Sequence, residues 1–217
     1  MKKNIYLLPG FALDPVIFSK LEIKGHLKLM AWLEPSKDEP LVTYARRIIE
    51  MYEILPGPET VLIGHSFGGM VVQTIASLIE VGTVILLASV KSAEEKPLSF
   101  KMIPVLPYHR WFSKAMVTQS VGFWGRFHGY NTPEKVAAFQ EMVNNKSDYY
   151  MQWSLQQILE WDTPEYSARL VHVHGDQDKT FFINRIKDPI IISGGHHLLP
   201  LQKPKEVSNI IQEVLEG

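Results

Sequence analysis

The 217-residue sequence predicts an α/β protein built on an open parallel sheet of about six strands, with helices on both faces. Three observations lead to this fold class. Short apolar runs recur along the chain and lack the alternation of half-exposed strands, as is typical of parallel strands covered on both faces. Helical patterns separate these runs. One long segment, residues 91–169, interrupts the alternation with helical patterns alone.

Apolar runs bounded by Gly, Pro or polar residues are the predicted strands. They are too short for buried helices, and helical segments lie between most of them, so right-handed crossovers should place them side by side and parallel. Ligands of such sheets bind beyond the carboxyl ends of the strands. The runs are residues 5–8, 27–33, 60–63, 83–88 and 170–173, with 189–193 as a shorter candidate.

Helix signals follow the strands in turn. Asp14-Pro15 offers an N-cap and a first-turn proline directly after the first strand. Residues 43–55 carry apolar side chains at spacings of three and four and stop before Pro56-Gly57. Residues 70–79 lead out of the third strand, and the segment from Pro204 onward places an apolar stripe on one face that should dock on the sheet.

Residues 91–169 are predicted to be a helical cap inserted into a core formed by residues 1–90 and 170–217. This insertion holds 14 of the 23 aromatic residues of the chain. One interpretation is that a small helical unit needs large side chains for its own core. The other is an apolar lid over a pocket. Its candidate lining residues are Trp111, Phe112, Phe123, Trp124, Trp153 and Trp161.

Composition excludes several classes of function. The formal net charge is −1, so no overall field exists to hold nucleic acid or anionic lipid. The absence of cysteine removes disulfides and thiolate chemistry. The N-terminal apolar stretch is shorter than the roughly 7 to 15 residues of a signal-peptide core, and no run approaches the roughly 20 that span a bilayer. We therefore expect a cytoplasmic protein that binds neither nucleic acid nor membrane.

The strongest motif is Gly64-His65-Ser66-Phe67-Gly68, which fits G-x-S-x-G between a predicted strand and a predicted helix. A sharp turn there lifts the serine hydroxyl clear of the sheet, while the glycines let neighbouring backbone pass. The following helix directs its N-terminal N–H groups at the same space. The alternative is a tightly packed turn in which Ser66 is only an N-cap.

A neutral serine hydroxyl is a weak nucleophile, so this interpretation requires a histidine base and a carboxylate that orients it. Asp176 and Asp178 follow the strand at residues 170–173, and His196 and His197 follow the last strand. Serine, acid and histidine therefore occur in that order along the chain.

These three motifs resemble the α/β-hydrolase family over nearly the whole chain. The resemblance implies that Asp178, fourth in Gly175-Asp176-Gln177-Asp178, is the acid and that Asp176 shapes the loop. Glu94 or Glu95, after the fourth strand, is a remote alternative.

The choice between the two adjacent histidines also rests on the resemblance. Family members commonly carry a proline seven residues after the catalytic histidine, and Pro204 stands in that relation to His197 rather than His196. The stretch from Gly194 also resembles the histidine loop of the plant esterase and hydroxynitrile-lyase branch. His197 is therefore the predicted base, with His196 as the alternative.

The oxyanion donors implied by the resemblance are the backbone N–H groups of Phe67 and Phe11. Family members usually carry His-Gly after the first strand, and this chain has Pro9-Gly10 there. The departure keeps the Phe11 donor but changes the support of its loop. A Pro-Gly turn without any catalytic role is the alternative.

The sequence thus predicts a carboxylesterase-like enzyme that cleaves a small, apolar, ester-like substrate without a metal or organic cofactor. The serine at position 66 of the G-x-S-x-G motif argues against the family's dehalogenases and epoxide hydrolases, which use an aspartate at that position. Carbon–carbon bond hydrolysis, thioesterase activity, acyl transfer and hydroxynitrile-lyase chemistry remain open alternatives, as does a non-catalytic ligand sensor. The sequence leaves the oligomeric state open.

Overall fold

The computed structural model describes residues 3–102, 112–128, 130 and 132–217. Six strands form one sheet in the order β2-β1-β3-β4-β5-β6, and every neighbouring pair is parallel. The predicted sheet is confirmed. Its strands are β1 (Asn4–Leu8), β2 (His26–Leu29), β3 (Gly57–His65), β4 (Val81–Leu87), β5 (Arg169–Gly175) and β6 (Ile190–Ile192).

Strand order reverses at the centre of the sheet. The chain passes from β1 outward to β2 and then returns to place β3 on the other side of β1. In parallel sheets, ligands bind beyond the carboxyl ends of the strands at such a reversal. The loops that leave β1 and β3 both open at this point, and they carry Phe11 and Ser66.

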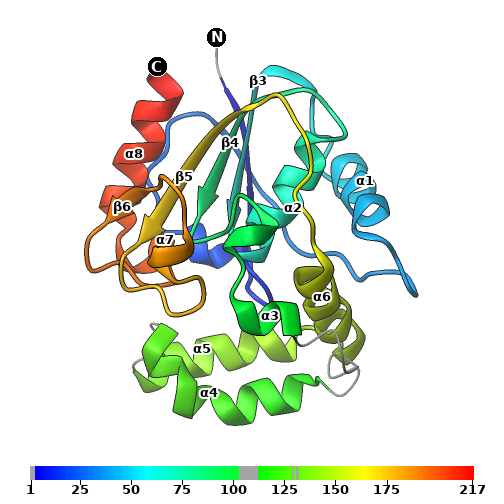
Figure 1. Ribbon diagram of the computed structural model, residues 1–217, viewed down its shortest axis with the longest axis vertical. Helices are drawn as coiled ribbons and strands as arrows, with labels where there is room; N and C mark the ends of the chain where they lie inside the picture. The colour runs from blue at the N-terminus through cyan, green and yellow to red at the C-terminus, as the bar shows by residue number, and fades with distance from the viewer. Residues whose placement is uncertain (1–2, 103–111, 129, 131) are drawn as a thin grey trace.

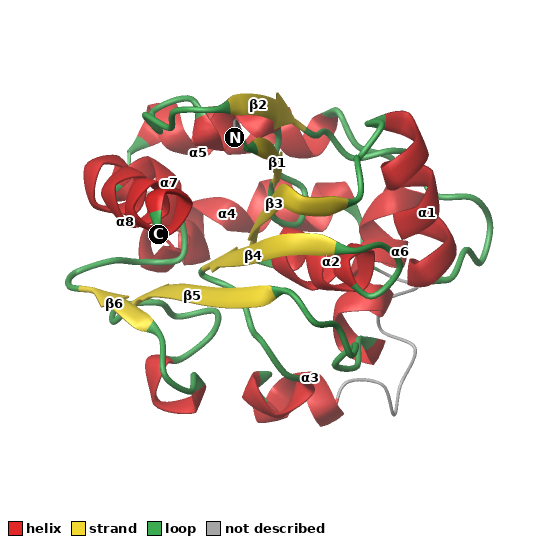
Figure 2. Cartoon of the chain, turned by 90° about the horizontal axis from the view of Figure 1, so that it is seen from above, coloured by secondary structure: helices red, strands yellow, loops and turns green. Residues whose placement is uncertain are grey.

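Helices cover both faces of the sheet (Figures 1 and 2). The amphipathic helix α8 (Pro204–Glu216) buries Val207 and Ile211 on one face. Helix α1 (Leu41–Met51) and helix α2 (Phe67–Ala76) pack on the other. All ten residues of α2 are buried, so this helix is enclosed and its N-terminus is held rigidly against the sheet.

In the described residues between β4 and β5 the chain forms four α-helices. They are α3 (Leu98–Met102), α4 (Lys114–His128), α5 (Pro133–Asn144) and α6 (Asp148–Glu160). Thr132 caps α5 and Ser147 caps α6, each accepting a backbone N–H of the first turn. Figure 1 shows α4 and α5 beyond the carboxyl ends of the strands. Whether residues 91–169 form a separate cap unit stays a prediction.

Two local expectations were wrong. The predicted first helix is a single 3-10 turn, Pro15–Phe18, and Asp14 makes no capping bond because its carboxylate pairs with Lys146. The predicted buried strand at residues 27–33 is the short edge strand β2, in which Leu27 and Leu29 are exposed. An edge strand has a neighbour on one side only, so an apolar run there does not imply burial.

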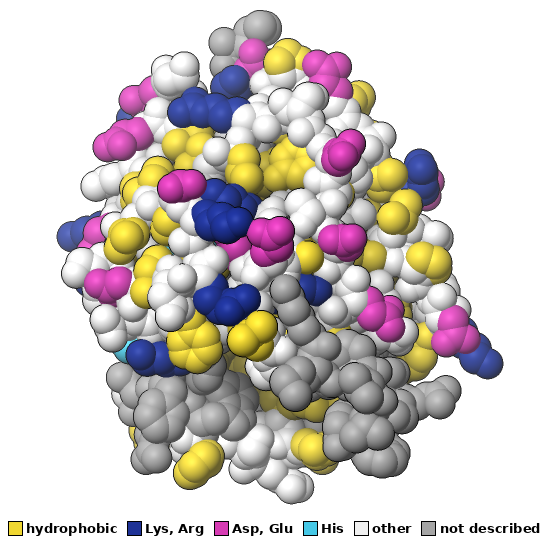
Figure 3. Space-filling view, in the orientation of Figure 1, with side chains coloured by type: hydrophobic (Ala, Val, Ile, Leu, Met, Phe, Trp, Pro, Cys, Tyr) yellow, Lys and Arg dark blue, Asp and Glu magenta, His cyan; other side chains and the backbone are white. Residues whose placement is uncertain are grey.

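The remaining connections are short. A 3-10 turn, Ile183–Arg185, joins β5 to β6, as the small spacing between the predicted strands implied, and α7 (Leu199–Gln202) precedes α8. None of the helices in the described ranges combines the length and the apolar character of a membrane span. On the face in Figure 3, side chains of both charge signs are interspersed.

Candidate active site

The turn between β3 and α2 is strained at Ser66. Its φ and ψ are 52° and −121°, a left-handed conformation that costs a non-glycine residue about 1 to 3 kcal/mol. A Cβ on Gly64 would lie 2.5 Å from the Gly68 carbonyl oxygen, and one on Gly68 would lie 2.3 Å from that of Pro9. The two motif glycines therefore permit the backbone crossing that raises the serine.

Two hydrogen bonds hold the strained turn. The Ser66 N–H donates to the Leu87 carbonyl at the end of β4 (3.0 Å), and the Ser89 hydroxyl donates to the Ser66 carbonyl (2.7 Å). A Cβ on Gly69 would lie 2.3 Å from the Ser89 hydroxyl oxygen, so the second glycine of the Gly68-Gly69 pair makes room for this support. Sequence reasoning did not identify Ser89, because a lone serine after a strand carries no motif.

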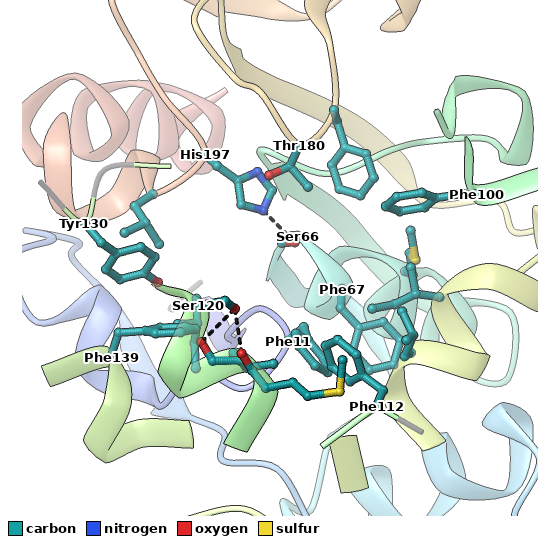
Figure 4. Close-up of a pocket in the computed structure, with 18 of the residues that line it drawn as sticks. Phe11, Ser66, Phe67, Phe100, Phe112, Ser120, Tyr130, Phe139, Thr180 and His197 are labelled. Atoms are coloured by element: carbon teal, nitrogen blue, oxygen red, sulfur yellow. Dashed lines mark hydrogen bonds between the residues drawn. The ribbon is translucent and has the colours of Figure 1, made fainter. Parts of the chain in front are cut away.

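The structure brings Ser66, His197 and Asp178 together. His197 Nε2 lies 2.9 Å from Ser66 Oγ, and His197 Nδ1 lies 2.8 Å from Asp178 Oδ2. Figure 4 shows the imidazole directed at Ser66 across the edge of a cavity. A carboxylate only accepts hydrogen bonds, so Nδ1 carries the hydrogen and Nε2 is left to accept the serine proton.

Asp178 is buried, with an exposed fraction of 2%. Its Oδ1 accepts the N–H groups of Thr180 (2.7 Å) and Phe181 (3.1 Å). Burial alone would raise the pKa of the carboxyl, but His197, His174 and the Thr180 N–H together hold that pKa below its ordinary value. The carboxylate therefore stays ionised and orients the imidazole.

The alternative acids lie elsewhere. Asp176 accepts the Gly194 N–H (2.8 Å) and so shapes the histidine loop, as predicted. Glu95 accepts the N–H groups of Lys91 and Lys187 (both 2.8 Å), and Glu94 pairs with Lys187 at the surface. None of the three carboxylates bonds to His197 in the described hydrogen bonds.

His196, the alternative base, makes other contacts. Its backbone N–H donates to Gln202 (3.1 Å), and its Nδ1 is buried without a hydrogen-bond partner in the described part of the chain. The two histidines of β5 lie in the interior: His172 bonds to the Ser89 carbonyl (3.0 Å), and His174 bonds to the Phe181 carbonyl (2.8 Å) and lies 3.5 Å from Asp178 Oδ2.

The predicted oxyanion residues flank the serine. Phe11, after β1, and Phe67, at the start of α2, both line the cavity beside Ser66. The indole N–H of Trp32 donates to the Gly10 carbonyl (2.9 Å) and supports the loop in which Pro9 replaces the expected histidine. Trp32 also stacks on Phe67, with ring centroids 5.1 Å apart. The role of the two N–H groups as oxyanion donors stays a prediction.

Sequence comparison identifies the family. A profile of the Alpha/beta hydrolase family matches residues 6–210, which is nearly the whole chain. The chain belongs to the alpha/beta hydrolase family. A search of curated proteins found no significant match.

Solved structures share the fold of this alpha/beta hydrolase. An esterase from Rhodococcus sp. ECU1013 matches with a TM-score of 0.72 and 12% identity over 100% of this chain and 91% of that chain. An esterase from Exiguobacterium antarcticum matches at 0.70 and 14%, over 100% and 94%. An epoxide hydrolase from Bacillus megaterium matches at 0.69 and 18%, over 100% and 96%. At these identities the likeness shows the fold alone. The resemblance of the histidine loop to the plant branch stays a prediction.

A cavity of about 680 Å³ opens on Ser66 and His197 of the hydrolase. Its described wall comes from α2, α3, α4, α5 and α6 and from the loops after β1, β5 and β6. Among the described lining residues, none carries an Asp, Glu, Lys or Arg side chain. Most of the wall is apolar, including Phe11, Phe67, Met70, Phe100, Phe139 and Phe181.

Two of the four tryptophans predicted to line the substrate pocket, Trp153 and Trp161, are not among the described residues that line this cavity. Trp153 and Trp161 are buried against the core and lie along a second cavity of about 490 Å³. Trp153 lies on the inner face of α6, where its ring packs against Tyr44 and its indole N–H donates to the Glu39 carbonyl (2.7 Å). The apolar pattern of the sequence alone could not show that this side chain faces the core.

The four remaining aromatic predictions have different outcomes. Trp111 lies outside the described residues, and so does the side chain of Trp124, whose backbone is in α4. Phe112 lines the cavity, packed 6.0 Å from Phe11 between ring centroids, whereas Phe123 is 74% exposed. Among the described residues, the aromatic part of the wall is thus formed by phenylalanines together with Tyr130.

Phe181 and Phe100 are lining residues that sequence reasoning missed. Phe181 meets the His197 ring edge-on at 5.7 Å and contacts Phe100 at 6.2 Å. Its position three residues after Asp178 was the available signal, because residues next to an acid loop face the same site. No group of three or more metal-ligand side chains that could hold a metal ion occurs among the residues searched, which are the described ones.

Proposed function

We propose that this chain is a serine hydrolase that cleaves an ester-like bond of a small, apolar substrate through an acyl-enzyme. The observation that carries the proposal is the continuous hydrogen-bond chain from Ser66 through His197 to the buried Asp178, which ends at a cavity. Nucleophile, base and orienting acid in this order are the requirements of acyl transfer at a serine.

In the first half-reaction, His197 Nε2 takes the Ser66 proton as Oγ bonds to the substrate carbonyl carbon. The electron pair of the carbonyl moves to its oxygen, which accepts the N–H groups of Phe11 and Phe67. The tetrahedral intermediate then expels the alcohol, which takes the proton from Nε2. Asp178 stabilises the transient imidazolium and keeps Nδ1 protonated throughout.

Water completes the reaction. The water oxygen attacks the acyl carbon while His197 Nε2 takes a proton from the water. The bond between the acyl carbon and Ser66 Oγ then breaks, and Nε2 returns the proton to Oγ. The free acid leaves, and the enzyme is restored. Each step uses only this chain's groups, the substrate and water.

The proposed substrate class follows from the residues that line the cavity beside Ser66. Apolar side chains dominate the cavity, and no formal charge of Asp, Glu, Lys or Arg stands among the described lining residues to pair with an ionic group. Burying an unpaired substrate charge there would be costly, whereas apolar groups gain from leaving water. Neutral esters with aliphatic or aromatic parts therefore fit best.

The decisive experiment compares wild-type protein, Ser66→Ala and the exposed control Ser77→Ala on p-nitrophenyl esters of increasing acyl length. We expect Ser66→Ala to lose nearly all turnover and Ser77→Ala to keep it, because triad members act as a unit. A fluorophosphonate should label Ser66 stoichiometrically in the wild type. Near-full turnover by Ser66→Ala would falsify the proposal. An inert Ser66 together with tight binding of apolar ligands would favour a ligand sensor.

A further inference from the structure

His174 is a buried histidine of β5 that the proposed mechanism does not use. Its side chain is fully buried, and its Nε2 lies 2.8 Å from the Phe181 carbonyl oxygen. Since a carbonyl only accepts, the ring hydrogen is on Nε2, and burial lowers the pKa of His174, so the ring is uncharged at neutral pH. His174 is therefore a neutral donor, fixed to a strand that is paired with β4 on one side and β6 on the other.

The bond from His174 anchors the acid loop, residues 176–181. Phe181 is held at both of its backbone polar groups, because its N–H donates to Asp178 Oδ1 (3.1 Å) and its carbonyl accepts from His174. The other carboxylate oxygen, Oδ2, faces His197 Nδ1 at 2.8 Å. His174 thus fixes, through Phe181, the backbone that orients the carboxylate toward the proposed base.

His174 also lies close to the acid itself. Its Nε2 is 3.5 Å from Asp178 Oδ2, which is longer than an ordinary hydrogen bond, so the N–H group acts on the carboxylate as a nearby dipole. The Phe181 ring meets the His197 ring edge-on, with centroids 5.7 Å apart. A shift of the acid loop would therefore displace both the carboxylate and the aromatic ring that contact the base.

We propose that His174 is a positioning residue for the proposed reaction: its Nε2–H holds the acid loop so that Asp178 and Phe181 stay in place against His197. This inference rests on the proposed function and adds to it a residue outside the serine, histidine and aspartate that carry out the chemistry.

His172 is the natural comparison for His174. It lies two residues earlier in β5, so its side chain is on the same face of the sheet, and the two rings are 5.5 Å apart. It is also buried, at 5% exposed, but its Nε2 bonds to the Ser89 carbonyl and not to the acid loop. If both histidines only filled the interior, their loss would have the same effect on His197. The different hydrogen-bond partners predict different effects.

The first test compares kcat on one p-nitrophenyl ester in His174→Leu, His174→Gln and His174→Asn, with His172→Leu as the matched control. Leucine removes the donor, the amide of glutamine can place an N–H near the same carbonyl, and the asparagine amide is one methylene shorter. We expect kcat to fall about tenfold to a hundredfold with leucine or asparagine, because a small displacement of the acid misaligns the base. His174→Gln should recover most of the loss, and His172→Leu should retain most of the wild-type kcat. If His174→Leu does not fold, the two amide variants decide alone, and equal kcat values for them overturn the proposal.

A readout without turnover separates this inference from the proposed function. In the Ser66→Ala background, the His197 Nδ1–H bonded to Asp178 should give a downfield proton NMR resonance, assigned by its loss in Asp178→Asn. We expect this resonance to persist in His172→Leu and to be lost or moved upfield in His174→Leu and His174→Asn. An unchanged resonance in both His174 variants overturns the positioning role whether or not the protein hydrolyses esters. The expected change in a protein that hydrolyses no ester would support the positioning of His197 and reject only the proposed function.

Discussion

His65 Nε2 lies 2.8 Å from the backbone carbonyl oxygen of His197, so the residue before the proposed nucleophile is bonded to the proposed base. The His65 side chain is fully buried, and burial lowers its pKa to about 3. Because a carbonyl only accepts, the neutral ring carries its hydrogen on Nε2. Gly10 makes room for it, since a Cβ there would lie 2.8 Å from His65 Nδ1.

This bond predicts that His65 positions His197. His65→Leu should lower kcat about tenfold to a hundredfold with little change in KM, because a small displacement of His197 weakens proton transfer more than substrate binding. His65→Gln, which can place an amide N–H near the same carbonyl, should recover most of the loss. Steady-state kinetics of both variants on one p-nitrophenyl ester provides the check. Equal kcat values for His65→Leu and His65→Gln would show that the packing of the side chain at position 65, and not its hydrogen bond to the His197 carbonyl, positions His197.

Asp178→Asn should lower kcat by about 10⁴ without unfolding the protein, the size of the corresponding change in a well-studied serine protease. An amide would donate to His197 Nδ1 and force the imidazole hydrogen onto Nε2, where it can no longer accept from Ser66. Asp176→Asn is the matched control, because its remaining Oδ1 can still accept the Gly194 N–H. Comparable losses in both variants would count against Asp178 as the orienting acid.

Acid should destabilise the fold well before the carboxylates protonate. Burial lowers the pKa of His65 to about 3 and of His172 to about 4, and lowers that of His174. An unfolded histidine titrates near 6.5, so below that pH the unfolded state binds protons that the folded state does not. The free energy of unfolding is therefore highest above about pH 6.5 and falls as the pH drops toward 4, by about 2 kcal/mol at pH 5 for each of His65 and His172, with His174 adding in the same direction.

Urea unfolding at pH 7.5 and pH 5 measures this loss. The midpoint should fall at pH 5, and His172→Gln should reduce the fall, because it removes one of the titrating groups. Asp178 contributes in the same direction at lower pH: its pKa is lowered in the folded state, so its contribution is present above its unfolded pKa and is lost as the pH falls through the folded value. A midpoint that is equal at both pH values contradicts the prediction.

The sequence predicted the parts of the fold that depend on local patterns. Central strands were recognised because apolar runs such as residues 60–63 are buried on both faces. Strand ends, which must lie at one edge of a parallel sheet, indicated Ser66 and the neighbouring Asp and His pairs, and the family resemblance then favoured Asp178 and His197, which the hydrogen bonds join to Ser66. Which aromatic residues line a cavity was not predictable from the apolar pattern, since Trp153 packs in the core although it lies in the segment predicted as a lid, and Phe181 lines the cavity although it follows the polar residues 176–180 outside that segment. Only tertiary packing separates them.

Gly68 and Gly122 should respond in opposite ways to substitution by alanine. A Cβ on Gly68 would lie 2.3 Å from the Pro9 carbonyl oxygen and 2.4 Å from that of Leu8, so Gly68→Ala must push β1 away from α2. We expect the free energy of unfolding to fall by about 2 to 3 kcal/mol, as for overpacking, together with loss of activity because the Phe11 loop moves.

A Cβ on Gly122 meets no described atom within 4 Å, and this exposed position lies inside α4. Gly122→Ala should therefore stabilise the protein by up to about 1 kcal/mol, through helix propensity, at unchanged turnover. Thermal unfolding of both variants and the wild type measures whether stability falls in Gly68→Ala and rises in Gly122→Ala. A Gly68→Ala protein with wild-type stability and activity would show that the close crossing of β1 and α2 is not required.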